Sequence, residues 1–186
     1  MEAQEHISDE ALIAAFRMDG MPYHLDMLFS RHIGKVRTML YQMVLHDADA
    51  DDLTQDVFRL VVRNIEKFSG RAAFSTWLYR VAMNRAKSFL KRRQRHPVAY
   101  GVDAPEPSGC SSLEPDLALA TRELDERITK AISMLRPKMR AAVILIIMQG
   151  VPLSEAARIE GCAIPTMYWR VHEARQQLRK LLEEEL

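Results

Sequence analysis

Apolar residues recur three or four positions apart along almost the whole chain, and no stretch alternates with a period of two for long enough to predict a strand. In the first half, this spacing predicts helices over residues 9–18, 23–45, 50–67 and 75–94. In the second half, it predicts helices over residues 114–135, 137–149, 153–160 and 164–183. The fold class expected from the pattern is therefore all-α.

The helical pattern stops between residues 96 and 112. This segment holds three prolines (Pro97, Pro105 and Pro107), two glycines and three serines, a composition that favours turns and extended chain over helix. We therefore expect two small helical domains, at residues 1–95 and 113–186, joined by a flexible linker at residues 96–112.

The composition fits a globular protein whose cysteines are reduced. Of the 186 residues, 48% are hydrophobic and 27% charged, which is ordinary for a soluble domain. The longest apolar run, residues 141–148, is far shorter than the roughly 20 residues that span a bilayer. The acidic residues 1–5 contain no apolar signal core, and the two cysteines form no CxxC motif. These features predict a cytoplasmic protein without membrane insertion or an export signal.

The formal net charge of +1 conceals blocks of opposite sign. Residues 1–62 carry five Lys/Arg against eleven Asp/Glu, and residues 63–95 carry ten against one. Residues 96–125 carry one against six, and residues 126–186 carry ten against seven. An acidic block followed by a concentrated basic block indicates separate surfaces for separate partners.

Residues 153–167 have the pattern of a helix-turn-helix. A short helix containing the small residue Ala157 leads to a turn at Gly161, and a second helix opens beside Pro165. Apolar residues of this second helix share one side, which leaves its polar, aromatic and basic residues for the other. Such a helix can enter the major groove of DNA. The alternative is a plain helical hairpin in which Trp169 completes a core.

Aromatic and basic residues alternate in the middle of the chain. Phe68, Phe74, Trp77 and Tyr79 are interleaved with arginines and with Lys87, and the basic run at residues 91–95 follows. Aromatic faces flanked by cations suit single-stranded or melted DNA, because bases stack on the rings while phosphates pair with the charges. The alternative is that the rings belong to the core, and for Trp77 and Phe89 this alternative is as well supported.

An acidic segment, residues 47–58, precedes this basic block. Carboxylates at a helix start are stabilised by the positive end of the helix dipole, and this alone accounts for them. No His, Ser or Cys stands nearby in a nucleophile arrangement, and no metal-ligand spacing surrounds the six histidines. The sequence therefore predicts no enzyme activity, no cofactor and no metal site.

These segments, in this order and around such a linker, resemble the extracytoplasmic-function (ECF) class of bacterial sigma factors in the sigma-70 family. The resemblance covers about residues 22–95 and 117–183. It is carried by residues 51–58 (DDLTQDVF), 74–86 (FSTWLYRVAMNRA) and 135–140 (LRPKMR), and by the helix-turn-helix.

The resemblance implies a role for each segment. The first domain would be like sigma region 2 and the second like sigma region 4. Residues expected to dock on core RNA polymerase are Asp52, Leu53, Gln55, Asp56 and Phe58. Residues expected to recognise and melt the −10 element are Phe68, Arg71, Phe74, Trp77, Tyr79, Arg80, Asn84 and Arg85. Residues expected to contact the duplex −35 element are Thr166, Tyr168, Trp169, Arg170, His172 and Arg175.

The second helix of the helix-turn-helix departs from the family pattern. Tyr168 and Trp169 stand where small or basic residues are usual, and Glu173 stands where a basic residue is common. Pro165 replaces the usual small residue, and Ala163 replaces a capping serine.

The function implied by the resemblance is that of an alternative sigma factor, which binds core RNA polymerase and directs transcription from particular promoters. Its partners would be core polymerase, promoter DNA and an anti-sigma factor. The alternative is a stand-alone helix-turn-helix regulator that binds duplex operators without polymerase. Such a regulator requires neither the acidic helix nor the aromatic and basic middle segment.

Overall fold

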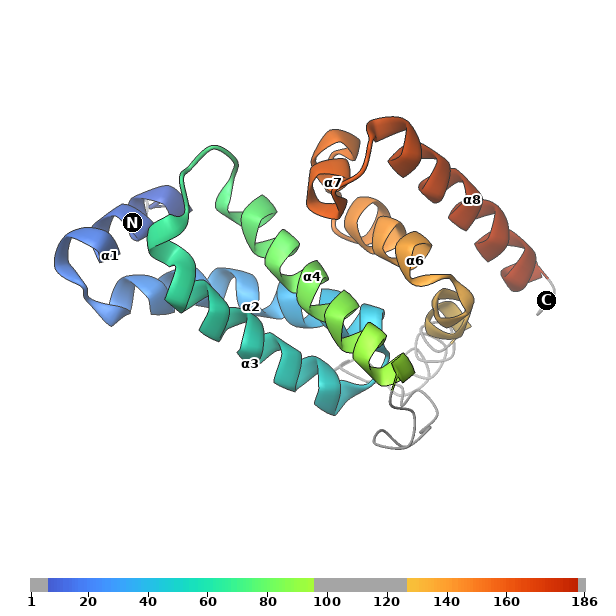
Figure 1. Ribbon diagram of the computed structural model, residues 1–186, viewed down its shortest axis with the longest axis horizontal. Helices are drawn as coiled ribbons and strands as arrows, with labels where there is room; N and C mark the ends of the chain where they lie inside the picture. The colour runs from blue at the N-terminus through green and yellow to red at the C-terminus, as the bar shows by residue number, and fades with distance from the viewer. Residues whose placement is uncertain (1–6, 96–126, 184–186) are drawn as a thin grey trace, which may run out of the picture.

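The computed structural model describes residues 7–95 and 127–183, which form helices joined by short turns, with no strand in either range (Figure 1). The first range holds α1 (Asp9–Asp19), α2 (Pro22–Val44), α3 (Asp47–Asn64), the 3-10 turn η1 (Ile65–Lys67) and α4 (Phe74–Arg95). The second holds a helix at residues 127–134, α6 (Pro137–Val143), the π-helical turn η3 (Ile144–Met148), α7 (Leu153–Glu160) and α8 (Ile164–Glu183).

The all-α prediction is confirmed in these ranges. The bounds of α7 and α8 agree with those predicted, and α1 to α4 agree within three residues at each end. The predicted linker at residues 96–112, and the first part of the helix predicted over 114–135, lie outside the described residues. No described helix combines the length and the hydropathy needed to cross a bilayer.

Local sequence determines where several helices begin and end. The hydroxyl of Ser8 accepts a hydrogen bond from the N–H of Ala11 at 3.1 Å and caps α1. Pro22 begins α2 at a position where its missing N–H is not required. Gly20 and Gly161 end α1 and α7 in the left-handed conformation, with φ of 70° and 63°, which glycine adopts without a steric penalty.

The first three long helices pack face to face. Leu28, Val36, Val57 and Leu78 are fully buried where α2, α3 and α4 meet, and α1 lies along the end of α2 (Figure 1). Each helix contributes one apolar stripe at 3.6-residue spacing to this core and leaves its polar face to solvent.

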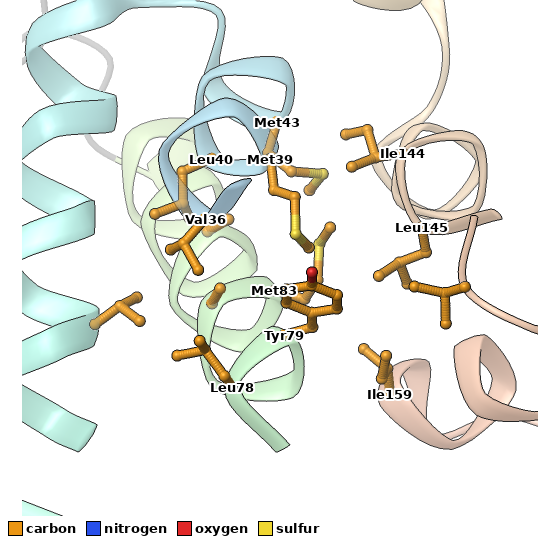
Figure 2. Close-up of a cluster of buried hydrophobic side chains, with 14 of the residues drawn as sticks. Val36, Met39, Leu40, Met43, Leu78, Tyr79, Met83, Ile144, Leu145 and Ile159 are labelled. Atoms are coloured by element: carbon orange, nitrogen blue, oxygen red, sulfur yellow. The ribbon is translucent and has the colours of Figure 1, made fainter. Parts of the chain in front are cut away.

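The two helical units are packed against each other, α4 against α7 and α2 against η3 and α6. An apolar cluster joins them (Figure 2): methionines and Tyr79 from the first unit face branched aliphatic side chains from the second. Its members are Met39 and Met43 of α2, Tyr79 and Met83 of α4, Ile144 and Leu145 of η3, and Ile159 of α7. Burial raises the pKa of the Tyr79 phenol, since a charged phenolate would lose its hydration there.

Arg140 of α6 is a buried cation that also crosses between the units. Its guanidinium donates to the carbonyl oxygens of Ile132 at 3.1 Å, Ser133 at 2.5 Å and Leu135 at 3.4 Å, which closes the end of the helix at residues 127–134. It also donates to the carbonyl of Met43 at 2.8 Å, in the last turn of α2. Desolvation lowers the pKa of this guanidinium, and the carbonyl dipoles replace part of the lost hydration.

Candidate nucleic-acid interface

The acidic helix α3 presents one face to solvent and buries the other. Asp52 and Gln55 are exposed, and Asp52 holds neither a hydrogen bond nor an ion pair with any other described residue. Leu53 and Phe58, which the sequence assigned to the same surface, are buried at 4% and 8% exposure. Phe58 packs against Phe29 of α2, with ring centroids 4.7 Å apart. Helical geometry therefore divides the five predicted docking residues between surface and core.

Asp56 is intermediate in exposure, because side chains of both α3 and α4 form ion pairs with it. Its carboxylate forms an ion pair with Arg85 of α4, and a weaker one with Arg59 at 3.6 Å. Asp49 likewise pairs with Arg93 of α4 at 3.4 Å. Part of the acidic block thus neutralises part of the basic block within the fold. This pairing ties Arg85, a predicted −10 residue, to the acidic helix.

A hollow of about 330 Å³ lies between α3 and α4 beside these ion pairs. Carboxylates of α3 line one side of it, and basic side chains of α4 line the other. The lining residues are Asp49, Asp52, Leu53, Asp56, Arg85, Ser88, Phe89 and Arg92. The exposed acid Asp52 is therefore one of the side chains that line this hollow.

The aromatic residues of the middle segment form a cluster. Phe68, Phe74 and Trp77 lie with ring centroids 5.6 to 5.9 Å apart in tilted or edge-on arrangements. Phe68 and Phe74 are 6% and 1% exposed, and Trp77 is half-buried. In this arrangement the first two rings belong to the core, as aromatic pairs of this geometry commonly do.

Helix α1 holds both ends of the loop between η1 and α4. The guanidinium of Arg17 donates to the carbonyl oxygens of Ile65 and Phe68, each at 2.6 Å, and to that of Glu66 at 3.1 Å. At the other end, a carboxylate oxygen of Glu10 accepts the N–H of Phe74 at 3.4 Å. Arg71, at the tip between these two anchors, is exposed.

On α4, the residues that follow this loop face α7. Arg80 donates to the carbonyl of Arg158, and the hydroxyl of Thr76 donates to the Glu155 carboxylate at 2.7 Å. Tyr79 is only 7% exposed within the apolar cluster between the units. Asn84 is exposed. The second unit therefore covers Tyr79 on this face of α4, while Arg71, Arg80 and Asn84 are exposed.

Helices α7 and α8 form the predicted helix-turn-helix. Ala156, Ala157 and Ile159 are the buried face of α7, and Met167, Val171 and Ala174 are that of α8. The left-handed Gly161 turns the chain between the two helices. Thr166, Tyr168, Trp169, His172 and Arg175 are exposed, so five of the six predicted −35 residues lie on the outer surface of α8.

Arg170 is the sixth, and it points inward. Its guanidinium lies 3.6 Å from the Glu160 carboxylate, and its side chain is only 12% exposed. The same carboxylate, 2% exposed, also binds Lys87 of α4 at 3.0 Å. Glu160 therefore joins the helix-turn-helix to the first unit and holds Arg170 away from the outer surface of α8.

Sequence reasoning did not identify Glu10, Arg17, Arg140 or Glu160, all of which position these surfaces. Each acts through a partner that is remote in sequence, and Arg17 is 48 residues from the carbonyl of Ile65. The signals in the sequence are that Arg140 belongs to the motif at residues 135–140 and that Arg140 and Glu160 are charged residues within or beside apolar helical faces. In the described part of the chain, no three His, Cys, Asp or Glu residues are grouped as metal ligands would be.

Comparison with known families gives two matches in chain order. Residues 28–96 match Sigma-70 region 2, and residues 125–178 match Sigma-70, region 4. The chain is 29% identical to the ECF RNA polymerase sigma-E factor of Escherichia coli (strain K12) over 181 residues, with 94% of each chain covered. It is 28% identical to the protein of the same name from Haemophilus influenzae, with 96% of this chain and 97% of that protein covered.

Two solved structures have a similar fold. One is the sigma factor RpoE in complex with the anti-sigma factor NepR from Bartonella quintana, at a TM-score of 0.70 and 26% identity. That match covers 86% of this chain and 96% of the other. The second is CnrH in complex with the cytosolic domain of CnrY, at a TM-score of 0.74 and 20% identity, covering 96% and 99% of the two chains. Both similarities extend across the two helical units described here.

Proposed function

Because this chain belongs to the ECF class of the sigma-70 family, it is an alternative sigma factor, and we propose that three of its surfaces divide the work of initiation. Helix α3 binds core RNA polymerase, the loop at residues 68–74 with α4 recognises the −10 element, and α8 recognises the −35 element. The observation that carries the proposal is that an exposed acidic helix and an exposed helix-turn-helix stand on the two units that match Sigma-70 regions 2 and 4.

The docking proposal rests on Asp52 and Gln55. Both side chains are exposed on α3, and Asp52 lies at the rim of the hollow between α3 and α4. An exposed carboxylate beside a recess can bind a basic side chain of a partner with little rearrangement. Leu53 and Phe58 support this surface from beneath, and Asp56 supports it through its ion pair with Arg85.

The −10 proposal rests on Arg71, Arg80 and Asn84. Arg71, Arg80 and Asn84 are exposed as the chain stands, and the guanidinium of Arg80 is released from the carbonyl of Arg158 when α7 leaves α4. Tyr79 is exposed by the same movement. Aromatic and cationic groups together bind an unstacked base and its phosphates. Phe68 and Phe74 hold the shape of the loop from within, and Trp77 lies beside them.

The domain bounds follow from this division. We place the region 2-like domain at residues 1–95, the linker at 96–112 and the region 4-like domain at 113–186. Promoter elements lie apart along the duplex, so both can be bound only when the two units separate. The proposed place of action is the cytoplasm, where polymerase and promoter DNA are found. By analogy with the complex of RpoE and NepR, we propose an anti-sigma factor as the regulatory partner.

The docking proposal can be tested by reversing one charge. Asp52→Arg should raise the Kd for purified core polymerase roughly ten-fold or more, because a like charge facing a basic partner is strongly unfavourable. The fold should be unaffected, since exposed substitutions of this kind change stability by about 0.5 kcal/mol or less. Binding is measured by fluorescence anisotropy of the labelled chain, and initiation by run-off transcription.

Asp26→Arg is the matched control, because Asp26 is an exposed acid of α2 outside all three proposed surfaces. It should bind core polymerase as the unsubstituted chain does. Equal affinity of all three proteins would remove α3 from the docking surface. A chain that binds operator duplexes tightly but never binds core polymerase would instead support the stand-alone regulator.

A further inference from the structure

Helix α8 exposes two large aromatic side chains on the surface assigned to DNA. Trp169 is 56% exposed and Tyr168 is 63% exposed, although Met167, one position earlier, is fully buried. The opposite face of α8 already supplies the apolar contacts that the second unit requires, through Met167, Val171 and Ala174. The two rings are therefore not needed for this core.

The two rings also lie near the start of the helix, which is where residues that contact base edges lie in a recognition helix. Tyr168 is stacked on His172 one turn later, with centroids 6.4 Å apart and an interplanar angle of 20°. Trp169 stands next to it, one turn after Pro165. Aromatic side chains have few rotatable bonds, so presenting them at a surface costs little conformational entropy.

Arginine, the side chain that most often recognises a base in the major groove, is not available at the centre of this surface. An arginine reads guanine by donating two hydrogen bonds to its O6 and N7. Arg170 is turned inward to Glu160, and Arg175 lies more than a turn further along the helix. Besides the aliphatic Ile164 and Pro165, the side chains exposed at the start of α8 for contact with base edges are Thr166, Tyr168, Trp169 and His172.

The major-groove edge of DNA offers one apolar group, the 5-methyl of thymine. We propose that Trp169 and Tyr168 bind thymine methyl groups, so that T·A base pairs specify the −35 element of this sigma factor. The proposal rests on the assignment of α8 to the −35 element and names the chemistry by which it is read. Contact of a ring face with a methyl removes apolar surface of both groups from water.

The exposed charges on α7 and α8 favour DNA over a protein as the occupant of this surface. Arg158 of α7 and Arg175, Arg179 and Lys180 of α8 are exposed, and no acid lies in the first turn of α8. Glu173 is the acid nearest the rings in sequence, and its carboxylate accepts a hydrogen bond from Gln177 at 2.9 Å. Exposed cations on the helices that carry the rings suit the phosphates that border a DNA groove.

The test begins by selecting duplexes. Holoenzyme assembled from the full chain and core polymerase is incubated with a library of duplexes randomised upstream of the start site, and bound duplexes are sequenced. Each thymine of the enriched upstream element is then replaced by deoxyuridine, which removes only the 5-methyl group. Binding of both duplexes is measured for the unsubstituted chain and for the Trp169→Ala, Trp169→Phe and Arg175→Ala variants.

At one or two positions, deoxyuridine should weaken binding by the unsubstituted chain about four-fold, the ratio that corresponds to about 0.8 kcal/mol for one buried methyl. At the position that Trp169 contacts, Trp169→Ala should bind both duplexes equally and more weakly, while Trp169→Phe should keep part of the difference there. Arg175→Ala, which loses a phosphate contact, should weaken both duplexes equally and make binding less dependent on salt.

The outcomes separate this inference from the proposed function. An enriched upstream element that lacks thymine, or one that binds equally well with deoxyuridine, would overturn the methyl contact while leaving α8 as the −35 reader. Unchanged DNA binding by Trp169→Ala would also overturn it and would indicate a protein occupant for the aromatic surface. If no upstream sequence is enriched, the −35 assignment itself is wrong.

Discussion

At the scale of single residues, Arg17 and Glu10 have more influence than the sequence suggests. Neither belongs to the predicted −10 surface, yet their hydrogen bonds fix both ends of the loop that carries Arg71. A loop fixed at both ends presents its tip residue in one place, which lowers the entropy lost on binding.

Arg17→Ala should lower the free energy of unfolding of the first unit by about 1–2 kcal/mol, because the carbonyls of Ile65 and Phe68 lose their charged donor. Hydrogen exchange at the amides of residues 65–74 should become faster, while exchange within α8 should be unchanged. Arg17→Lys keeps the charge and should lie between the two. Exchange in the loop that is the same for all three proteins would show that Arg17 does not hold it.

Residue roles were only partly predictable from the sequence, for a physical reason. The residue types at an interface can be listed from a resemblance, but burial depends on which side of the helix meets a neighbour. Leu53 and Phe58 lie on the buried side of α3, and Arg170 on the inward side of α8. In α8 the apolar stripe expected from the sequence was Ile164, Met167, Val171, Ala174 and Leu178; Met167, Val171 and Ala174 are buried, whereas Ile164 is 50% exposed.

At the scale of secondary-structure elements, the sequence was informative, because helix periodicity and helix stops are local properties. Gly161 and Pro152 bracket α7, and the predicted ends of α7 and α8 agree with the structure. The π-helical turn at Ile144–Met148 was not predicted. Its residues are all apolar, and such a run contains no local signal that distinguishes an α-helical turn from a wider one.

The left-handed conformation of Gly161, between α7 and α8, can be tested by replacing it with alanine and comparing the effect with that of the same substitution at Gly34 in α2. Gly161 has a φ of 63°, and a Cβ built there meets nothing within 4 Å, so Gly161→Ala should cost only the backbone strain, about 1–2 kcal/mol. Gly34 lies within α2, also with open space around its Cβ. Gly34→Ala should therefore stabilise the chain by about 0.5–1 kcal/mol. Thermal unfolding followed by circular dichroism measures both, and a lower Tm for Gly34→Ala or a higher one for Gly161→Ala would contradict these signs.

At the scale of the whole molecule, the separation of charge along the sequence does not carry over completely to the surface. The pairs of Asp49 with Arg93 and Asp56 with Arg85 join residues 44 and 29 positions apart, which no local pattern predicts. The contact between the two units was likewise unexpected, because the intervening residues 96–112 indicate only that the units are tethered.

We expect the radius of gyration of the chain to depend on the contact between the two units. Lys87→Glu places two carboxylates together at the position where Lys87 now binds Glu160 at 3.0 Å, in a partly buried site where repulsion is poorly screened. The two units should separate more often, and the radius of gyration from small-angle X-ray scattering should increase. Lys91→Glu, the same change at an exposed position one turn later, should leave the radius unchanged. An equal radius for all three proteins would show that this ion pair does not hold the units together.

The contact surface of the first unit is rich in methionine, with Met39, Met43 and Met83 against Ile144, Leu145 and Ile159. Methionine is unbranched and polarizable, so it adapts its shape to a changed neighbour where leucine or isoleucine would leave a gap. Substitutions on the opposing side can therefore accumulate without unfolding either half. Under the proposal that the two units separate to bind promoter DNA, such substitutions would change how tightly the units are held together without changing how well each unit folds.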